Sequence, residues 1–364
     1  MSKVYFTDMR TSFTENLPKK LTRLIDRAGL GAIDFDHKFV AIKIHFGEMG
    51  NLAYLRPQYA RALAAYIKER GGLPFLTDCN TLYVGSRKNA LEHIETAYIN
   101  GYTPYATGCQ VIIADGVRGT DEAYIPIGCE EVKTAKIGRA IADADIIISL
   151  NHFKGHEDAG FGGALKNLGM GSGSRAGKME MHYDGKPVVD RRCRGCLKCA
   201  TICANDGIHY ENSKAVIDHD NCVGCGRCIA ICSFDAIKPH NSSSEASLNR
   251  RIAEYAYAVV KDKPNFHISI AADISPNCDC HPENDAPIVP NIGMFASFDP
   301  VAIDLAAADA VNAMPANPRS ALSEAECRCH DHFINVHPNT NWRVQIEHGE
   351  EIGLGSSEYE LIRI

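Results

Sequence analysis

The sequence predicts an α/β protein whose parallel-sheet domain is interrupted by a cysteine-rich insertion. Residues 1–150 alternate short β-branched or aromatic runs with amphipathic helical runs, and such alternation is typical of a parallel sheet covered by helices. A dense group of cysteines follows between Cys193 and Cys232. Beyond this group the α/β alternation resumes. The two flanking parts are therefore expected to form one domain, with residues 1–186 as its first part, 187–240 as the insertion and 241–364 as its completing part.

Local patterns predict the individual elements of the flanking parts. Pro57 is expected to open a helix that runs to Lys68 and ends before Gly71-Gly72, a start and a stop that suit proline and glycine. Asp299 and Pro300 are the expected N-cap and first turn of a helix through Ala313. The other expected strands are Lys3–Thr7, Phe39–Phe46, Pro74–Thr77, Gln110–Ala114, Asp145–Leu150, Phe266–Ala272 and Glu358–Ile364. The other expected helices are Leu17–Ala28, Arg87–Asn100, Ala135–Ala142 and Asn249–Lys261.

Eight cysteines of the insertion carry the most specific signal. They form two runs of spacing C-x2-C-x2-C-x3-C, first Cys193, Cys196, Cys199 and Cys203, then Cys222, Cys225, Cys228 and Cys232. In two-cluster ferredoxins of this spacing, the fourth cysteine of each run binds the other cluster. The insertion is therefore predicted to be a two-cluster (8Fe) ferredoxin-like module with two 4Fe-4S clusters. The expected ligand sets are Cys193, Cys196, Cys199 and Cys232 for cluster 1, and Cys222, Cys225, Cys228 and Cys203 for cluster 2.

Other features of the insertion agree with this prediction. Gly195, Gly224 and Gly226 supply the permissive backbone that close approach to a cluster needs, and residues 208–217 are expected to form a short hairpin between the two runs. Ala204 and Ser233 stand where a proline usually follows the fourth cysteine, but this change removes no ligand. Zinc sites or disulphides are the alternatives, and zinc rarely needs eight thiolates at this spacing.

Composition restricts the class of protein. The chain has 364 residues and a net charge of −7, so neither nucleic acid nor an anionic membrane is an expected partner. It has no apolar run long enough to span a membrane and no signal-peptide region at its N-terminus. Fifteen cysteines, eight of them cluster ligands, require a reducing compartment. We therefore expect a cytoplasmic protein from an anaerobe, or from an organism that shields its clusters from oxygen.

Residues 151–186, just before the insertion, are rich in glycine and do not continue the alternation of strands and helices. They are expected to form a loop in which the backbone approaches another group closely. Neither phosphate fingerprint fits: Ser172 and Met179 break the Walker pattern, and Gly177 comes one residue late for the dinucleotide pattern. The remaining hypothesis for this segment is an anion-binding site formed by Lys166, Arg175 and Lys178.

Polar side chains follow the buried strand Asp145–Leu150, where open α/β sheets place their ligands. His152, Lys154 and His156 occupy alternating positions there, and His45 is expected at the same edge. We take His152, Lys154, His156 and Lys166 as catalytic candidates. In the alternative, structural interpretation, the histidines hydrogen-bond the strand ends and Lys166 is solvated or faces a phosphate.

A second concentration of cysteine and histidine lies nearer the C-terminus. Two C-x-C-H units, Cys278 to His281 and Cys327 to His330, could bind a third metal or cluster through Cys278, Cys280, Cys327 and Cys329 if the fold brings them together. Packed free thiols or a redox disulphide are the alternatives. Among the isolated cysteines, Cys79 is the one that could face the cleft.

Several segments resemble the family of uncharacterised iron–sulphur centre proteins. They are IKIHFGEMGN (42–51), LTDCNTLYVGSRKNALEH (76–93), ADGVRG (114–119), HFKGHEDAGFGGALKNLGMG (152–171) and NIGMFASFDPVAID (291–304). The resemblance implies an α/β domain of unknown function with an inserted two-cluster ferredoxin.

The segment GHEDAGFGGALKNLGMG also resembles part of the lactate racemases, more distantly. In that family a lysine anchors a nickel-pincer nucleotide, and nearby histidines ligate nickel or move the substrate proton. The matching positions are His156 and Lys166, with His182 a further ligand candidate, so Lys166, His182, Arg175 and Lys178 are the cofactor-binding candidates. Gly162 replaces the usual serine, and Leu168-Gly169 lack the usual proline.

Three functions stay open. The first is an iron–sulphur oxidoreductase that passes electrons through both clusters to a substrate or cofactor in the α/β cleft. The second is a non-catalytic electron carrier or redox-sensing subunit. The third is a racemase-like metal enzyme with accessory clusters. The first two imply a redox partner protein, and the first also implies a small-molecule substrate. The cluster nearer Cys193 is expected closest to the cleft, because it follows the glycine-rich segment directly.

Overall fold

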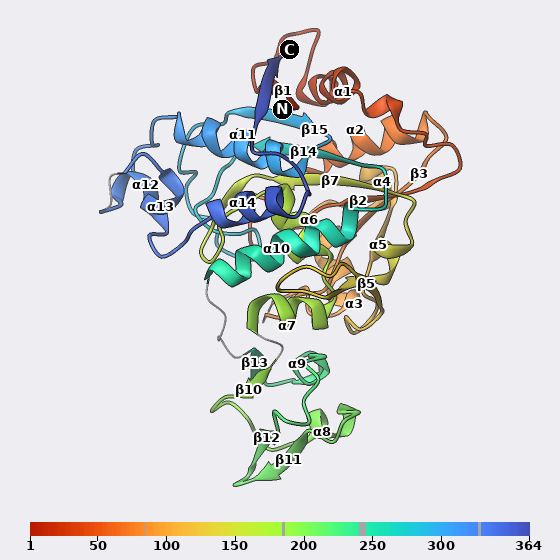
Figure 1. Ribbon diagram of the computed structural model, residues 1–364, viewed down its shortest axis with the longest axis vertical. Helices are drawn as coiled ribbons and strands as arrows, with labels where there is room; N and C mark the ends of the chain where they lie inside the picture. The colour runs from red at the N-terminus through yellow and green to blue at the C-terminus, as the bar shows by residue number, and fades with distance from the viewer. Residues whose placement is uncertain (84, 184–185, 240–244, 327–328) are drawn as a thin grey trace.

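The computed structural model describes residues 1–83, 85–183, 186–239, 245–326 and 329–364 (Figure 1). Within these ranges the protein is a mixed α/β fold around an eight-stranded, mostly parallel sheet of order β16-β1-β15-β14-β7-β2-β3-β4. Only β15 runs antiparallel to its neighbours in that sheet. The strands of the sheet are β1 (Ser2–Asp8), β2 (Phe39–Lys43), β3 (Leu73–Asp78), β4 (Gln110–Ile113), β7 (Ile146–His152), β14 (Asn265–Ala271), β15 (Gly293–Ser297) and β16 (Tyr359–Arg363).

Helices cover both faces of the sheet, as the alternation in sequence predicts. The central strand β7 is buried along its whole length. Its side chains alternate between two apolar cores, with Ile147 in one and Ile146, Ile148 and Leu150 in the other. The core around Ile147 is covered by α6 (Ala164–Ser172), α10 (Glu245–Val260), α11 (Pro300–Asn312) and α14 (Arg343–Glu351). The opposite core is covered by α1 (Leu17–Arg27), α2 (Pro57–Lys68) and α3 (Ala90–Ile99).

Two predicted helices that begin at a proline are confirmed. The helix α2 has the predicted bounds, and the Asp299 carboxylate caps α11 by accepting from the backbone N–H groups of Val301 and Ala302, both at 2.9 Å. The helix predicted over Ala135–Ala142 is wrong in its first half. Residues Thr134–Gly138 form β6, which pairs with β5 (Glu122–Pro126), and only α5 (Arg139–Asp143) is helical. Burial in β6 alternates with a period of two, the strand pattern.

The glycine-rich segment is not the loop that its composition suggests. It contains a small hairpin of β8 (Lys154–His156) and β9 (Gly160–Gly162), followed by α6 and α7 (Arg175–Tyr183). The glycines let other parts of the chain come close. A Cβ at Gly155 would lie 2.1 Å from the Pro276 carbonyl oxygen, and one at Gly169 would lie 2.2 Å from that of Ile252 on α10. Close packing within the protein therefore accounts for these two glycines.

Replacing Gly169 by alanine tests that contact. The added methyl group meets backbone rather than a flexible side chain, so α6 and α10 must separate. We expect Gly169→Ala to destabilise the fold by about 1–3 kcal/mol, measured by denaturant unfolding. The matched control is Gly207→Ala, where the nearest atom would be 3.4 Å away in ordinary contact. Equal stability of Gly169→Ala and wild type would contradict the tight packing of α6 on α10.

The cysteine-rich segment contributes no described residue to the central sheet. Its strands form two separate pairs, β10 (Pro187–Val189) with β13 (Ile237–Pro239), and β11 (Ile208–Glu211) with β12 (Lys214–Ile217), which is the predicted hairpin. Two short helices, α8 (Lys198–Ile202) and α9 (Arg227–Ile231), complete the segment. It lies at the foot of the molecule in Figure 1, while β7 and β14 on either side of it in sequence are neighbours in the sheet.

The remaining described helices are short: η1 (Leu30–Ala32), α4 (Pro104–Thr107), α12 (Ala321–Glu324) and α13 (His332–Val336). None of the helices in the described ranges is long and apolar enough to cross a membrane.

Candidate functional site

A pocket of about 810 Å³, partly open to solvent, lies where three parallel strands end. The last residues of β2, β3 and β7 are Lys43, Asp78 and His152, and all three line it. Because the carboxyl ends of neighbouring parallel strands meet at one edge of the sheet, this is the place where open α/β sheets bind ligands. The expectation that His45 lies at the same edge is confirmed, and Cys79 also lines the pocket.

A buried ion pair forms the floor of the pocket. The Lys43 ammonium lies 2.9 Å from the Asp78 carboxylate and donates to the Asn167 side-chain oxygen at 2.7 Å. Burial opposes ionisation of Asp78, but Lys43 and two nearby histidines outweigh burial and lower the pKa of that carboxyl group. We did not single out Lys43 and Asp78 from the sequence. A charged residue at the end of each apolar strand was the signal that could have found them.

A second buried network joins Arg87, Glu48 and His45. The Arg87 Nε–H donates to Glu48 at 3.0 Å, and one of its terminal nitrogens lies 2.9 Å from His45 Nε2. Burial, and then the charge of Arg87, lower the pKa of His45 to about 3. His45 is therefore neutral at physiological pH, and its Nδ1 accepts from the Gly47 backbone N–H at 3.0 Å while its Nε2 faces the guanidinium. This arrangement fixes Arg87 in the pocket lining.

His152 and Lys154 are held in the wall of the pocket by Asp279. His152 Nδ1 lies 2.9 Å from the Asp279 carboxylate, and its Nε2 donates to the Ala272 carbonyl oxygen at 2.8 Å. The Lys154 ammonium lies 3.5 Å from the same carboxylate and donates to the His152 carbonyl oxygen. Both ring nitrogens of His152 are therefore occupied, which suits a residue that positions the wall.

His156 and Lys166 converge on the Cys278 sulphur. The backbone N–H groups of Asp158 and Ala159 donate to His156 Nδ1, at 3.0 and 3.1 Å, so the ring proton lies on Nε2. The Lys166 ammonium donates to the Cys278 Sγ at 3.2 Å, and His156 contributes to lowering the pKa of the same thiol. The sequence pointed to His156 and Lys166, but their partner Cys278 was assigned to a different group.

The electrostatics of this contact favour a thiolate. A hydrogen bond from Cys280 holds the pKa of Cys278 well below its ordinary value against the effect of burial, and Lys166 and His156 act in the same direction. Burial disfavours the charged form of Lys166, but Cys278, Cys280 and Glu157 outweigh it and raise the pKa of the ammonium. These shifts favour an ammonium on Lys166 and a thiolate on Cys278.

The other cofactor-binding candidates have different environments. His182 lines the pocket, with its ring edge-to-face to Tyr83 at 5.8 Å, and burial followed by the charge of Lys166 lowers its pKa to about 3. Lys178 also lines the pocket and donates to the Gly173 carbonyl oxygen at 2.6 Å. The Arg175 guanidinium lies behind the lining and donates to the carbonyl oxygens of Arg118, Thr81 and Lys88.

The two C-x-C-H units are placed differently. Cys278 and Cys280 line the pocket, with Glu157 and His281 beside Cys280. Cys329 is exposed, is not part of the lining, and its Sγ contacts the Asn335 side-chain oxygen at 2.9 Å. Cys327 lies outside the described residues.

A separate, smaller cavity that is partly open to solvent lies within the cysteine-rich segment. Four cysteines line this cavity: Cys203, Cys222, Cys225 and Cys228. Burial raises the pKa of Cys222, and the neighbouring Cys225 and Cys203 add to this effect. In the same way Cys193 and Cys232 add to burial in raising the pKa of Cys199. The fourth cysteine of each run thus lies near the other run.

The sulphur atoms of the segment are available as ligands. All eight cysteines are free thiols, with no disulphide among the residues described. Backbone N–H groups donate to two of the sulphurs, from Gly195 and Ala215 to Cys193 at 3.4 Å and from Ala236 to Cys232 at 3.3 Å. Gly195, Gly224 and Gly226 all have left-handed backbone conformations, with φ between 65° and 70°.

The second cysteine run contacts the α/β domain. Gly226 packs against the side chains of Arg175 and Met179 on α7, and Lys88 donates to the Cys232 carbonyl oxygen at 3.3 Å. Leu82 and Met179 share an apolar cluster with Cys199 and Cys228, and Leu82 also lines the pocket. Both runs therefore take part: Cys199 belongs to the first run, and Cys199 and Cys232 are expected ligands of cluster 1.

Comparisons with solved structures give two distant similarities. A crystal structure of a Thermotoga maritima protein from a structural genomics programme has a TM-score of 0.39 and 12% identity, over 80% of this chain and 56% of that one. The lactate racemase apoprotein from Thermoanaerobacterium thermosaccharolyticum has a TM-score of 0.37 and 10% identity, over 75% of this chain and 51% of that one. The chain therefore spans little more than half the length of either protein. At these TM-scores the similarity does not identify a shared functional site.

No curated protein matches the sequence. A family model does, and it covers most of the chain, residues 40–309, which include the strands that carry the pocket and the whole cysteine-rich segment. That model is described as a domain of unknown function, and the chain belongs to this family, DUF362.

Proposed function

We propose that this protein is an iron–sulphur oxidoreductase that passes electrons through two 4Fe-4S clusters to a small anionic substrate in the α/β pocket. The observation that supports the proposal best is the apolar contact of Leu82 and Met179 with Cys199 and Cys228. Leu82 belongs to this contact and also to the pocket lining. One continuous apolar cluster therefore extends from the pocket lining to the cysteines.

The cysteine-rich segment fits the proposed clusters. Four thiols surround one cavity, and they are the crossed set of three cysteines from the second run and one from the first. Cys193, Cys196, Cys199 and Cys232 are the residues left for the other cluster. When bound, such clusters exchange single electrons, and hydrogen bonds to sulphur tune their potential. The backbone N–H groups that donate to Cys193 and Cys232 are donors of this kind.

The charge of the pocket favours an anion. Its lining includes five basic side chains, Lys43, Arg87, Lys154, Lys166 and Lys178. Its acidic groups are three carboxylates, Asp78, Glu157 and Asp158, and the Cys278 thiol, whose ionised form is favoured. In a partly desolvated pocket this imbalance attracts a negatively charged group. A carboxylate or phosphate is the class of substrate that it would hold.

His156 and Lys166 are the proposed proton donors. A carbonyl group that gains two electrons also takes up two protons, and a donor must lie within hydrogen-bonding reach. His156, whose ring proton lies on Nε2, and Lys166 both line the pocket, and the Lys166 ammonium donates to the Cys278 sulphur. In this proposal Lys154 and His152 hold the wall, and Asp279 fixes both of them.

An external redox partner protein would supply the electrons. Cys196 is exposed, whereas Cys228 is buried next to the α/β domain. We therefore place the partner at the Cys196 end of the segment, away from the pocket. Clusters of this kind and free thiols persist in a reducing compartment, which supports a cytoplasmic location.

Lys166→Met tests the role of the pocket. Anaerobically reduced protein is mixed with small carboxylates that carry a carbonyl group or a carbon–carbon double bond, and cluster reoxidation is followed by absorbance. We expect at least one of these acids to oxidise the wild type, and Lys166→Met to slow that reaction at least about tenfold by removing a proton donor and an anion contact. Iron content should stay unchanged.

The control is Lys214→Met, because Lys214 is an exposed lysine of β12 far from the pocket lining in sequence. It should react like the wild type. If every acid oxidises wild type and Lys166→Met at equal rates, electrons leave the clusters without using the pocket. That result would contradict the enzyme proposal and support the electron carrier.

A further inference from the structure

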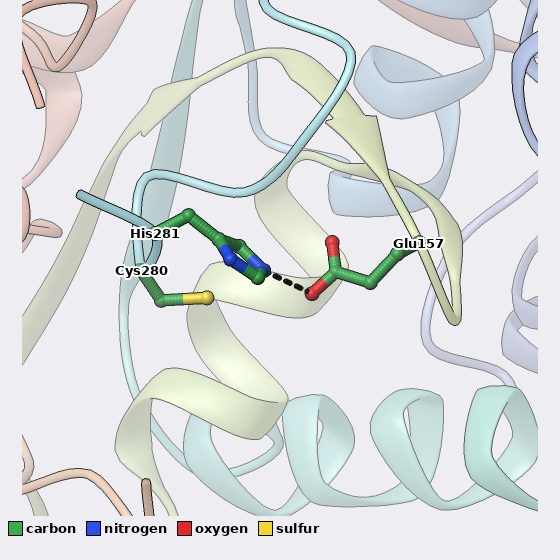
Figure 2. Close-up of side chains that lie close together, drawn as sticks. All are labelled: Glu157, Cys280 and His281. Carbon is green, nitrogen blue, oxygen red and sulfur yellow. Dashed lines mark hydrogen bonds and ion pairs between the residues drawn. The ribbon is translucent and has the colours of Figure 1, made fainter. Parts of the chain in front are cut away.

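Three side chains that could bind one metal ion meet beside the pocket, Glu157, Cys280 and His281. Each offers a ligand atom, and these atoms all lie within 4.8 Å of one another. Figure 2 shows the three side chains pointing toward one another from two different segments of the chain. Glu157 follows β8, whereas Cys280 and His281 lie in the segment between β14 and β15. Their meeting depends on the tertiary fold and is not a local sequence pattern.

The donor atoms are a sulphur, a nitrogen and a carboxylate oxygen. Zinc binds this combination of cysteine, histidine and glutamate, and three protein ligands with one open position are typical of its catalytic sites. Magnesium and calcium prefer oxygen ligands alone and suit this group poorly. The donor chemistry therefore selects a soft or borderline divalent ion.

The surroundings of His281 also suit a metal ligand. Its Nε2 faces Glu157 at 2.8 Å, while its Nδ1 faces the Glu283 carboxylate at 3.4 Å. A carboxylate on the second ring nitrogen orients a metal-bound histidine and increases its basicity. Nε2 would then be the ligand atom, and Glu283 the group that orients the ring.

The group is open on one side. Glu157 and Cys280 line the pocket, with Cys278, His156 and Lys166 in contact beside them. His281 is not part of the lining and holds the group from behind. An ion bound here would present its open position to whatever occupies the pocket.

We propose that Glu157, Cys280 and His281 form a binding site for one divalent metal ion, with Zn²⁺ as the fitting ion, on the wall of the pocket. This site differs in its ligands from the group of four cysteines suggested by the two C-x-C-H units. It does not depend on the clusters, because its ligands belong to the α/β domain. Its free coordination position suits an anionic group, such as a carboxylate.

Zinc binding to the anaerobically purified full chain tests the site. The protein is treated with a chelator, incubated with one equivalent of Zn²⁺ and desalted, and zinc and iron are measured separately. We expect about one zinc per chain, with one sulphur neighbour in the zinc X-ray absorption spectrum at about 2.3 Å. Cys280→Ser and His281→Ala should weaken zinc binding at least about tenfold, since each removes a ligand.

The other C-x-C-H unit supplies the matched control. Cys329→Ser and His330→Ala change the same residue types at exposed positions and should retain the zinc. Unchanged iron in all four variants shows that loss of zinc does not reflect misfolding or loss of the clusters. The proposal is overturned if the wild type retains no zinc, or if Cys280→Ser and His281→Ala retain as much as the controls. Because zinc and iron are counted separately, neither result alters the test of the oxidoreductase.

Discussion

Replacing Cys203 by alanine is expected to halve the iron content, from about eight to about four atoms per chain, by removing one whole 4Fe-4S cluster. Cys203 belongs to the first run, but it lines a cavity with Cys222, Cys225 and Cys228 of the second. Cys228→Ala should therefore have the same effect on the same cluster. Iron and acid-labile sulphide, measured after anaerobic purification, report the loss.

Pairs of substitutions distinguish two arrangements of the ligands. In the crossed arrangement, the fourth cysteine of each run binds the cluster of the other run; in the alternative, each run binds its own cluster. If the ligand sets are crossed, Cys203→Ala with Cys228→Ala removes no more iron than either change alone. Cys203→Ala with Cys199→Ala should remove nearly all of it, because the two residues then serve different clusters. The reverse pattern would show that each run binds its own cluster. Cys129→Ala is the control, since this half-buried thiol lies outside the segment.

Lys43→Met is expected to destabilise the α/β domain by about 3 kcal/mol, because it removes the nearest cation from the buried Asp78 carboxylate and leaves it with the more distant Arg87, 3.9 Å away. Both side chains of this pair are almost fully buried, with 1% and 3% of their surfaces exposed. The methionine side chain is close to lysine in length and shape, so lost packing contributes little. Denaturant unfolding followed by circular dichroism measures the change in free energy.

An exposed ion pair provides the comparison. Lys238 lies 3.1 Å from Asp190, with 53% and 25% of the two side chains exposed. Lys238→Met should cost no more than about 1 kcal/mol, since water screens such pairs. Adding Asp78→Asn to Lys43→Met should recover part of the lost stability. Similar losses for Lys43→Met and Lys238→Met would show that burial does not set the strength of the Lys43–Asp78 pair.

Elements with local signals were predictable from the sequence. The proline and glycine that bound α2 and the Asp299 cap of α11 act within a single turn, so their effects can be read residue by residue. β15 was missed because its place between β14 and β1 depends on partners distant in sequence. The strand β6 was taken for a helix because its pairing with β5 determines its structure.

The site was predictable to a similar extent. The sequence pointed to His156 because it follows a buried strand at the edge where open sheets bind ligands, and to Lys166 because it matches a lysine of the lactate racemases. Their partner Cys278 lies more than a hundred residues away, and no local pattern brings it to Lys166. The same holds for Glu157 with Cys280 and His281. The cysteine runs differ, because their spacing alone predicts a ligand set when one tight turn supplies most of it; these sets stay a prediction.

Iron and acid-labile sulphide in the anaerobically purified wild-type protein test the central proposal most directly. Two 4Fe-4S clusters predict about eight irons and eight sulphides per chain, and a reduced sample with electron paramagnetic resonance signals of 4Fe-4S centres. Zinc in the cysteine-rich segment in place of iron, with no sulphide, would contradict the proposal, and so would disulphides among its eight cysteines.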